Sequence, residues 1–95
     1  MKKVLILPSF ERSVKKLPQQ DKKQLAESLE MLNRFLLTGE APFGFRFKKI
    51  NSDKYEFRVG IRLRVIVKED GDIFYLVLVG SHDEVRRYLK NFRTS

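Results

Sequence analysis

The hydrophobic period of this chain changes once, and that change constrains the fold more than any other feature. From Gln19 to Thr38, leucines recur every three or four residues, which is helical spacing. These leucines are Leu25, Leu29, Leu32 and Leu36. After the turn-like segment Gly39–Gly44 the spacing falls to two, which is typical of strands with one buried face. The sequence therefore predicts an α+β fold, with helices in the first half and a sheet in the second.

The first half of the chain predicts one strand and two helices. Val4–Leu7 is an apolar, strand-sized run that stops at a proline. Ser9 is expected to cap a first helix, which Pro18 ends because proline disfavours a helical residue before it. The buried face of that helix is expected to carry Phe10, Val14 and Leu17. The second helix begins at Gln19 and ends at the Thr38-Gly39 stop signal.

The second half predicts four strands. They are expected at Phe45–Lys48, Tyr55–Val59, Leu63–Val67 and Ile73–Val79. The first three alternate apolar with charged residues, so we expect antiparallel strands with apolar side chains inward and charged side chains outward. Glu69–Asp72 is a hairpin signal, and Ile73–Val79 lacks polar alternation, as expected for a central strand covered on both faces.

A last helix is predicted to begin just after Ser81. Ser81 and Glu84 match the Ser-x-x-Glu capping box, which places His82 at the junction of strand and helix. The apolar stripe of this helix is expected to contain Val85, Tyr88, Leu89 and Phe92. The element order is β-α-α-β-β-β-β-α, and the length of 95 residues predicts a single domain spanning residues 1–95.

The charge of the chain points to a polyanionic partner. Lys and Arg outnumber Asp and Glu by 20 to 12, for a net charge of +8. Nucleic acid is the leading partner, while an acidic protein or a merely solubilising surface stays open. The chain has no Cys and one His, which excludes disulfides and Cys- or His-rich metal sites and favours the cytoplasm. No apolar run approaches the roughly 18 residues of a membrane span, so no membrane partner is expected.

Two arginines are predicted to face each other across a hairpin. If Gly60–Arg62 forms a short loop, Arg58 lies directly opposite Arg64. Opposed like charges are destabilising, so we expect compensation from Glu56 or from a bound phosphate. With Arg46 and Lys48 outward on the preceding strand, this face could bind an RNA backbone and a pentavalent phosphate. The alternative is an ordinary solvated sheet face.

His82 is the single side chain whose ordinary pKa suits proton transfer near neutrality. The alternative is a first-turn histidine that packs or is solvated. Tyr88 lies on the apolar stripe of the last helix, so packing is its expected role, with its hydroxyl at the rim as a second possibility. The same helix carries a basic surface that would track a phosphate backbone or simply keep the tail in water. Its members are Arg86, Arg87, Lys90 and Arg93.

Several short motifs occur in an order that resembles one known family. They are Phe10-x-Arg12-x-Val14-Lys15-Lys16-Leu17, Lys48–Ile50, Tyr55–Gly60, Arg62–Val67 and Val79–His82. Over nearly the whole chain this layout is similar to the RelE/ParE toxin superfamily, and Gly80–Asp83 looks most like its YafQ branch. The resemblance implies a RelE-like fold in which an antiparallel-rich, curved sheet packs against two N-terminal helices and is followed by a short C-terminal helix.

The resemblance also implies a function. A RelE-like toxin enters the ribosomal A site and cleaves mRNA by attack of the 2′-hydroxyl on the adjacent phosphate, without a metal ion or small-molecule cofactor. The implied catalytic residues are His82 as general base or acid and Arg58 and Arg64 as phosphate-holding groups. The implied RNA-binding residues are Arg46, Lys48, Lys49, Arg62, Arg86, Arg87 and Tyr88. The implied protein partner is a cognate antitoxin whose acidic or amphipathic segment covers the basic face.

This chain departs from the family pattern at two points. Glu56 occupies a place that is basic in RelE itself, and the chain lacks the further histidines of YafQ-type enzymes. The C-terminal aromatic position of the family matches Arg86 or, without a gap, Tyr88. Two other functions therefore stay open: a ParE-like inhibitor of DNA gyrase, and an inactive relative that binds RNA or an antitoxin. The fold alone does not choose among them.

Overall fold

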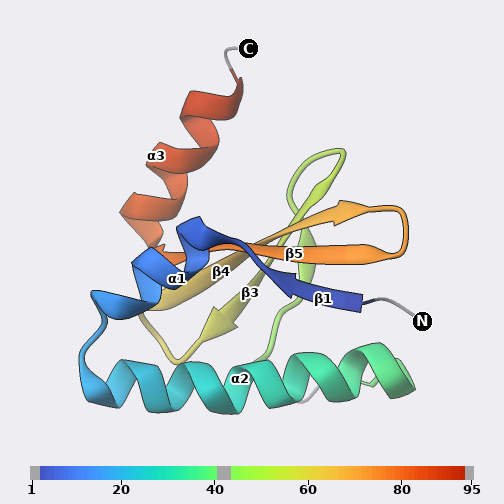
Figure 1. Ribbon diagram of the computed structural model, residues 1–95, viewed down its shortest axis with the longest axis horizontal. Helices are drawn as coiled ribbons and strands as arrows, with labels where there is room; N and C mark the ends of the chain where they lie inside the picture. The colour runs from blue at the N-terminus through green and yellow to red at the C-terminus, as the bar shows by residue number, and fades with distance from the viewer. Residues whose placement is uncertain (1–2, 41–43, 94–95) are drawn as a thin grey trace.

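Within the part of the chain that the structure describes, three helices and five strands follow one another in the predicted β-α-α-β-β-β-β-α order (Figure 1). The structure is a computed structural model that describes residues 3–40 and 44–93, the last two without their side chains. The elements are β1 Lys3–Ile6, α1 Pro8–Lys15, α2 Gln19–Thr38, β2 Lys48–Lys49, β3 Lys54–Val59, β4 Leu63–Asp70, β5 Ile73–Ser81 and α3 His82–Arg93. None of these helices is both long and apolar enough to cross a bilayer.

The five strands form one mixed sheet in the order β1-β5-β4-β3-β2. β1 runs parallel to β5, and the three other pairings are antiparallel, which confirms the antiparallel-rich sheet. The tight turn between Asp70 and Ile73, which are paired partners, confirms the predicted hairpin. Figure 1 shows that the sheet twists strongly, with α2 along one side and α3 projecting from the opposite side.

One face of the sheet carries the main core beneath α2. Phe57, Val59, Val65 and Val67 point to this face and are fully buried. They pack with the α2 stripe, where Leu25 and Leu32 are buried and Leu29 and Leu36 half-buried. α2 ends as predicted at Gly39, whose φ of 78° is the left-handed conformation that closes helices.

The other face is more covered than the alternation of charges predicted. Ile66, Val77 and Val85 form a second buried cluster under α3, with Tyr88 and Leu89 packed against it. A β-bulge contributes, because Ile66 pairs with Leu78 and Val67 with Leu76, which leaves Val77 as the extra residue of β5. The buried Ile66 departs from the outward charges predicted for β4, whereas β5 is an inner strand covered on both faces, as predicted. The stripe residue Phe92 lies outside the described side chains.

The prediction that Ser9 caps the first helix was also wrong. α1 begins at Pro8, a residue whose fixed φ suits the first helical turn, and its N-cap makes no side-chain hydrogen bond. The Ser9 hydroxyl instead donates to the carbonyl of Val77 at 2.7 Å, and the Ser13 hydroxyl accepts from the N–H of Val79 at 3.1 Å. Beyond the end of β1, serine side chains of α1 thus make the hydrogen bonds that the backbone of β5 would otherwise lack on this edge.

The strand predicted at Phe45–Lys48 is mostly absent. Only Lys48–Lys49 form β2, because Arg46 adopts a left-handed backbone, with φ at 53°, that interrupts the ladder. The predicted alternation of buried and exposed side chains is still present, since Phe45 is buried and Arg46 exposed. The Phe45 carbonyl still accepts a hydrogen bond from the N–H of Arg58. Residues 41–43, within the segment Gly39–Gly44 predicted as turn-like, lie outside the described residues.

Candidate nucleic-acid interface

A groove of about 600 Å³ opens where β5 ends, α3 begins and the β3–β4 turn approaches the end of α1. We call it the His82 groove. Its polar lining comes from Ser13, Lys16, Asp21, Arg62, Arg64, Ser81, His82 and Glu84. Its apolar lining comes from Leu17, Pro18, Ile61, Leu63, Leu78 and Val79. The groove therefore brings together two of the three residues predicted to be catalytic, His82 and Arg64.

The capping box places His82 at the mouth of this groove. The Glu84 carboxylate accepts a hydrogen bond from the N–H of Ser81 at 2.9 Å, and the Ser81 hydroxyl accepts one from the N–H of Glu84 at 3.2 Å. His82, between them, is the first residue of α3 and is exposed. The Ser81 hydrogen bonds lower the pKa of Glu84, and the charges of Arg87 and Lys16 add to this. An ionised carboxylate therefore stands close to the imidazole in sequence and in the groove.

The register of β3 and β4 confirms the predicted pair of arginines. Arg58 is the direct cross-strand partner of Arg64, joined by a short turn in which Gly60 has a φ of 62°. A side chain at Gly60 would also meet the Gln24 amide of α2 at 2.6 Å. Arg58 and Arg64 are both half-buried on the α3 side of the sheet. Arg58 does not line the His82 groove, so the two arginines share a face but not the groove.

Glu56 supplies the compensating charge. Its carboxylate oxygen Oε2 lies 3.5 Å from Nη1 of Arg64 and 3.9 Å from Nζ of Lys48. The Glu56 side chain is 10% exposed, that of Arg64 18% and that of Lys48 64%. Lys48 is the cross-strand partner of Glu56, so the cluster spans three neighbouring strands. We call Lys48, Glu56, Arg58 and Arg64 the basic strip.

Arg62, which the family resemblance implies to be an RNA-binding residue, forms an ion pair with α2. It lies in the turn before β4, and its Nη2 atom contacts both carboxylate oxygens of Asp21 on α2, at 3.0 and 3.2 Å. Asp21 is buried, so this ion pair ties the turn to the helix on the main-core side. The side chain remains 73% exposed and lines the His82 groove beside Arg64.

Lys49 and Arg46 lie apart from the basic strip. Lys49 is paired with Tyr55, and its ammonium lies 5.9 Å from the centre of the Tyr55 ring. Tyr55 packs against the main core, so Lys49 belongs to the face opposite Lys48. Arg46 is exposed in the irregular segment before β2. The six strand-side cations predicted for the site are therefore divided between the two faces.

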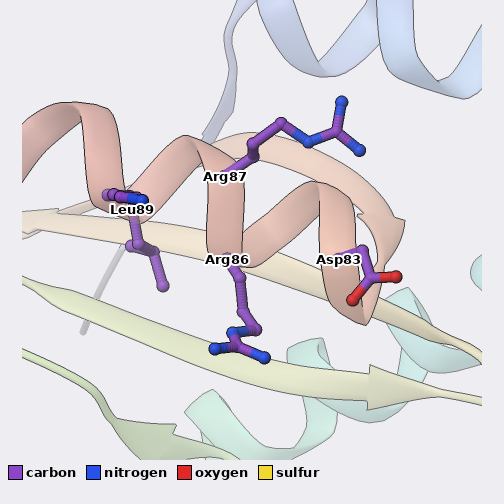
Figure 2. A pocket seen from close by; sticks show the side chains of 5 residues that line it. Asp83, Arg86, Arg87 and Leu89 are labelled. Atoms are coloured by element: carbon purple, nitrogen blue, oxygen red, sulfur yellow. The ribbon is translucent and has the colours of Figure 1, made fainter.

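Along α3, a second hollow of about 560 Å³ is lined by Asp83, Arg86, Arg87, Leu89 and Lys90. Figure 2 shows Arg86 and Arg87 leaving the helix on different sides, with Arg86 directed toward the strands. Both arginines are exposed, as is Lys90. The predicted basic surface of the last helix is therefore present, and the side chain of Arg93 lies outside the described part.

Tyr88 packs as its place on the apolar stripe predicted. Its ring lies against the cluster of Ile66, Val77 and Val85. Burial raises the pKa of the Tyr88 phenol, and the nearby Asp53 carboxylate adds to the rise. The phenol is therefore protonated at neutral pH and is not suited to act as a base.

Neither a family model nor a curated protein matches this sequence. Solved structures do match over most of the chain. The RelB–RelE antitoxin–toxin complex of Methanococcus jannaschii contains a chain that is 19% identical, with a TM-score of 0.67 over 88% of this chain and 96% of that one. The DinJ–YafQ complex of E. coli gives 16% identity and a TM-score of 0.66 over 90% and 98%. The chain has the fold of the RelE and YafQ toxins.

A third neighbour extends the likeness. The YoeB dimer of Staphylococcus aureus is 19% identical, with a TM-score of 0.63 over 85% of this chain and 97% of that one. The three matches span 96–98% of each neighbour and 85–90% of this chain, so the RelE-like fold accounts for most of the chain. They confirm the fold that the sequence motifs predicted.

Within this RelE-like fold, sequence reasoning missed one cation of the groove. Lys16 is the C-cap residue of α1 and lines the His82 groove opposite the start of α3. Its charge contributes to lowering the pKa of Glu84, which places it close to that carboxylate. The Lys15-Lys16 pair before Pro18 was visible in the sequence, but nothing local indicated that the end of α1 meets α3. Among the described residues, no group of three His, Asp or Glu side chains is arranged to hold a metal ion.

Proposed function

We propose that this protein is the toxin of a toxin–antitoxin pair and that it is an endoribonuclease acting on mRNA at the ribosomal A site. One observation carries the proposal: the groove at the end of β5 is lined by His82, Arg64 and Lys16 together. A proton-transfer group beside fixed cations is what cleavage of a phosphodiester requires. The RelE-like fold supports the assignment, because its neighbours include toxins solved with their antitoxins.

The proposed reaction uses the 2′-hydroxyl of the RNA as its nucleophile. This oxygen attacks the adjacent phosphorus, the bond to the 5′-oxygen of the next nucleotide breaks, and a 2′,3′-cyclic phosphate and a 5′-hydroxyl result. His82 moves a proton at the 2′- or 5′-oxygen as general base or acid. Arg64 and Arg58 stabilise the negative charge that builds on the phosphate oxygens. Because the substrate supplies the nucleophile, we propose no metal ion or small-molecule cofactor.

The remaining cations are proposed to bind the RNA backbone on either side of the cleaved bond. Arg86 and Arg87 line the hollow along α3, next to His82 in the chain, and are exposed to a passing strand. Lys48 extends the basic strip on the same face of the sheet. Lys49, Arg46 and Arg62 would act at the periphery, and Tyr88 would offer its hydroxyl from the edge of its cluster. A cognate antitoxin would cover these cations with acidic or amphipathic segments.

A second candidate is a relative that binds RNA or an antitoxin without cleaving RNA. The observation that favours it is the contact between Glu56 and Arg64, because a carboxylate already occupies one of the proposed phosphate-holding groups. The groove also offers a single imidazole for both proton transfers. These two features make the cleavage assay decisive.

The proposal is tested by inducing the protein in bacteria without a partner gene. Wild type, His82→Ala, Arg64→Ala and the control Lys23→Ala, an exposed change on α2, are compared for growth and for cuts in a translated mRNA by primer extension. We expect wild type and Lys23→Ala to arrest growth with cuts confined to translated frames, and the groove variants to relieve both.

Other results would redirect the assignment. Growth arrest without cuts, accompanied by a DNA-damage response, would support a gyrase inhibitor instead. Normal growth with tight RNA binding by the purified protein would support the binding-only relative.

A further inference from the structure

Glu56 is the one buried carboxylate of the basic strip, and the mechanism above gives it no step. It is 7% exposed and sits on the α3 face of the sheet, diagonal to Arg64 across β3 and β4. Its contacts to Arg64 and Lys48, at 3.5 and 3.9 Å, are longer than the 2.7–2.9 Å or so of strong charged hydrogen bonds. The carboxylate therefore holds two cations loosely.

Stability alone is a poor account of this arrangement. Burying a carboxylate and a guanidinium removes both from water, and buried ion pairs are often no more stabilising than apolar residues of similar volume. An apolar cluster lies beside Glu56, since its cross-strand partner Ile66 is fully buried. A side chain continuing that cluster would be the simpler way to stabilise the sheet.

Arg64 connects this carboxylate to the groove. Its guanidinium contacts Glu56, while the residue also lines the His82 groove. Its partner on β5 is Gly80, which adds no side chain between Arg64 and the start of α3. Arg64 thus stands between an internal anion on β3 and the place where a phosphate would lie.

We propose that Glu56 is a specificity-determining residue that occupies Arg64 and Lys48 in the free protein and is exchanged for a phosphate of bound RNA. The inference rests on the proposed function, because it takes an RNA backbone as the ligand. An isolated phosphate competes poorly with a carboxylate that is already in place. An RNA strand that also contacts the His82 groove and α3 supplies the additional binding energy, so the exchange selects for an extended strand.

The test is the binding of a fluorescently labelled, fully 2′-O-methylated RNA, which cannot be cleaved, measured by anisotropy over a range of salt concentrations. Glu56→Gln keeps the shape and removes the charge. We expect it to bind about fivefold more tightly than wild type at low salt. We also expect its slope of log affinity against log salt to steepen by up to about 0.7, because wild type leaves an unpaired carboxylate in the complex that offsets one of its phosphate contacts.

Two controls separate exchange from a general change in charge. Glu69→Gln removes a half-buried carboxylate of β4 that accepts a hydrogen bond from the Tyr55 hydroxyl at 3.2 Å. It changes the net charge equally and should leave the salt slope as in wild type. In an Arg64→Ala background, Glu56→Gln should raise the RNA affinity less than about twofold, because the guanidinium that this change frees in wild type is absent.

A measurement on the protein alone keeps the inference separate from RNA cleavage. Sulfate should raise the melting temperature of Glu56→Gln more than that of wild type or Glu69→Gln. If Glu56→Gln does not fold by circular dichroism, Glu56→Asp, which withdraws the carboxylate by one methylene, should show the same changes in smaller size.

Two results would decide against part of the account. RNA binding and sulfate response of Glu56→Gln equal to those of Glu69→Gln would overturn the exchange and leave Glu56 a residue of the fold. Sulfate stabilisation of Glu56→Gln without RNA binding by any of the proteins would show that Glu56 competes with an anion for Arg64, and it would overturn both RNA as the ligand and the proposed function.

Discussion

The two faces of the sheet come from alternate residues of the same strands, yet they carry different chemistry. Phe57 and Val65 point to the α2 side and are fully buried in the main core. Their neighbours Arg58 and Arg64 point to the α3 side, where a half-buried pair of like charges is balanced by Glu56. The side chains of these strands on the first face are apolar and explained by packing, whereas those on the second include opposed like charges and a buried carboxylate. We infer that the first face stabilises the fold and the second binds the substrate.

Truncation on the core face should have the largest effect on stability. Phe57 is completely buried and contacts the Phe45 ring, with centroids 5.0 Å apart. Phe57→Ala should lower the free energy of unfolding by about 3–5 kcal/mol, because it removes a large apolar side chain and leaves a cavity. Denaturant unfolding measures the change. A loss below about 1 kcal/mol would mean that this face is not the principal core.

The ion pair on the core side should contribute less. Arg62→Ala leaves the buried Asp21 carboxylate without the guanidinium that contacts it, at a cost of about 1 kcal/mol, since solvent reaches the exposed Arg62. Arg62→Lys restores a charge and should recover part of the loss. An Asp21→Asn, Arg62→Ala double-mutant cycle gives the coupling, and a coupling near zero would return Arg62 to the RNA-binding group alone.

On the α3 face, removal of a charge should be harmless or favourable for folding. Arg58→Gln relieves the repulsion with Arg64 and should raise the free energy of unfolding by a few tenths to about 0.5 kcal/mol. The same change should weaken binding of uncleavable RNA. A clear loss of stability in Arg58→Gln would contradict the division between the faces, because it would make the arginine pair a structural element.

The smallest effect concerns the capping box beside His82. Because hydrogen bonds from Ser81 lower the pKa of Glu84 below its ordinary 4.5 in the folded protein, this carboxylate stabilises the fold above that pH. The contribution is lost as the pH falls through the lowered pKa. After solvent screening of this exposed group we expect a few tenths of a kcal/mol. Glu84→Gln should remove this part of the pH dependence of unfolding, and an unchanged profile would argue against it.

The local features of this molecule were predictable from its sequence. The short loop at Gly60–Arg62 fixed the register that opposes Arg58 and Arg64, and the Ser81–Glu84 box fixed the start of α3. Both depend on residues within a few positions of one another, where turn and capping chemistry decide the conformation. The spacing of apolar residues along α2 and the end of that helix at Gly39 were predictable for the same reason.

The features that escaped prediction depend on how distant elements meet. Lys16 joins the His82 groove because α1 ends opposite the start of α3. Arg62 contacts α2 because its guanidinium pairs with the buried Asp21, which lies 41 positions earlier in the chain. Ser9 was predicted to cap α1, but its hydroxyl donates a hydrogen bond to the Val77 carbonyl of β5 instead. Sequence periodicity carries no information on these long-range contacts.

The most direct test of the central claim is a single-turnover assay of mRNA cleavage on purified translating ribosomes, with the free energy of unfolding measured on the same preparations. His82 is exposed, so His82→Ala should leave the unfolding free energy within about 0.5 kcal/mol of wild type. We expect the variant to lower the cleavage rate by about 10²–10⁴-fold. Cleavage by His82→Ala at the wild-type rate would contradict the assignment of the α3 face as a ribonuclease site.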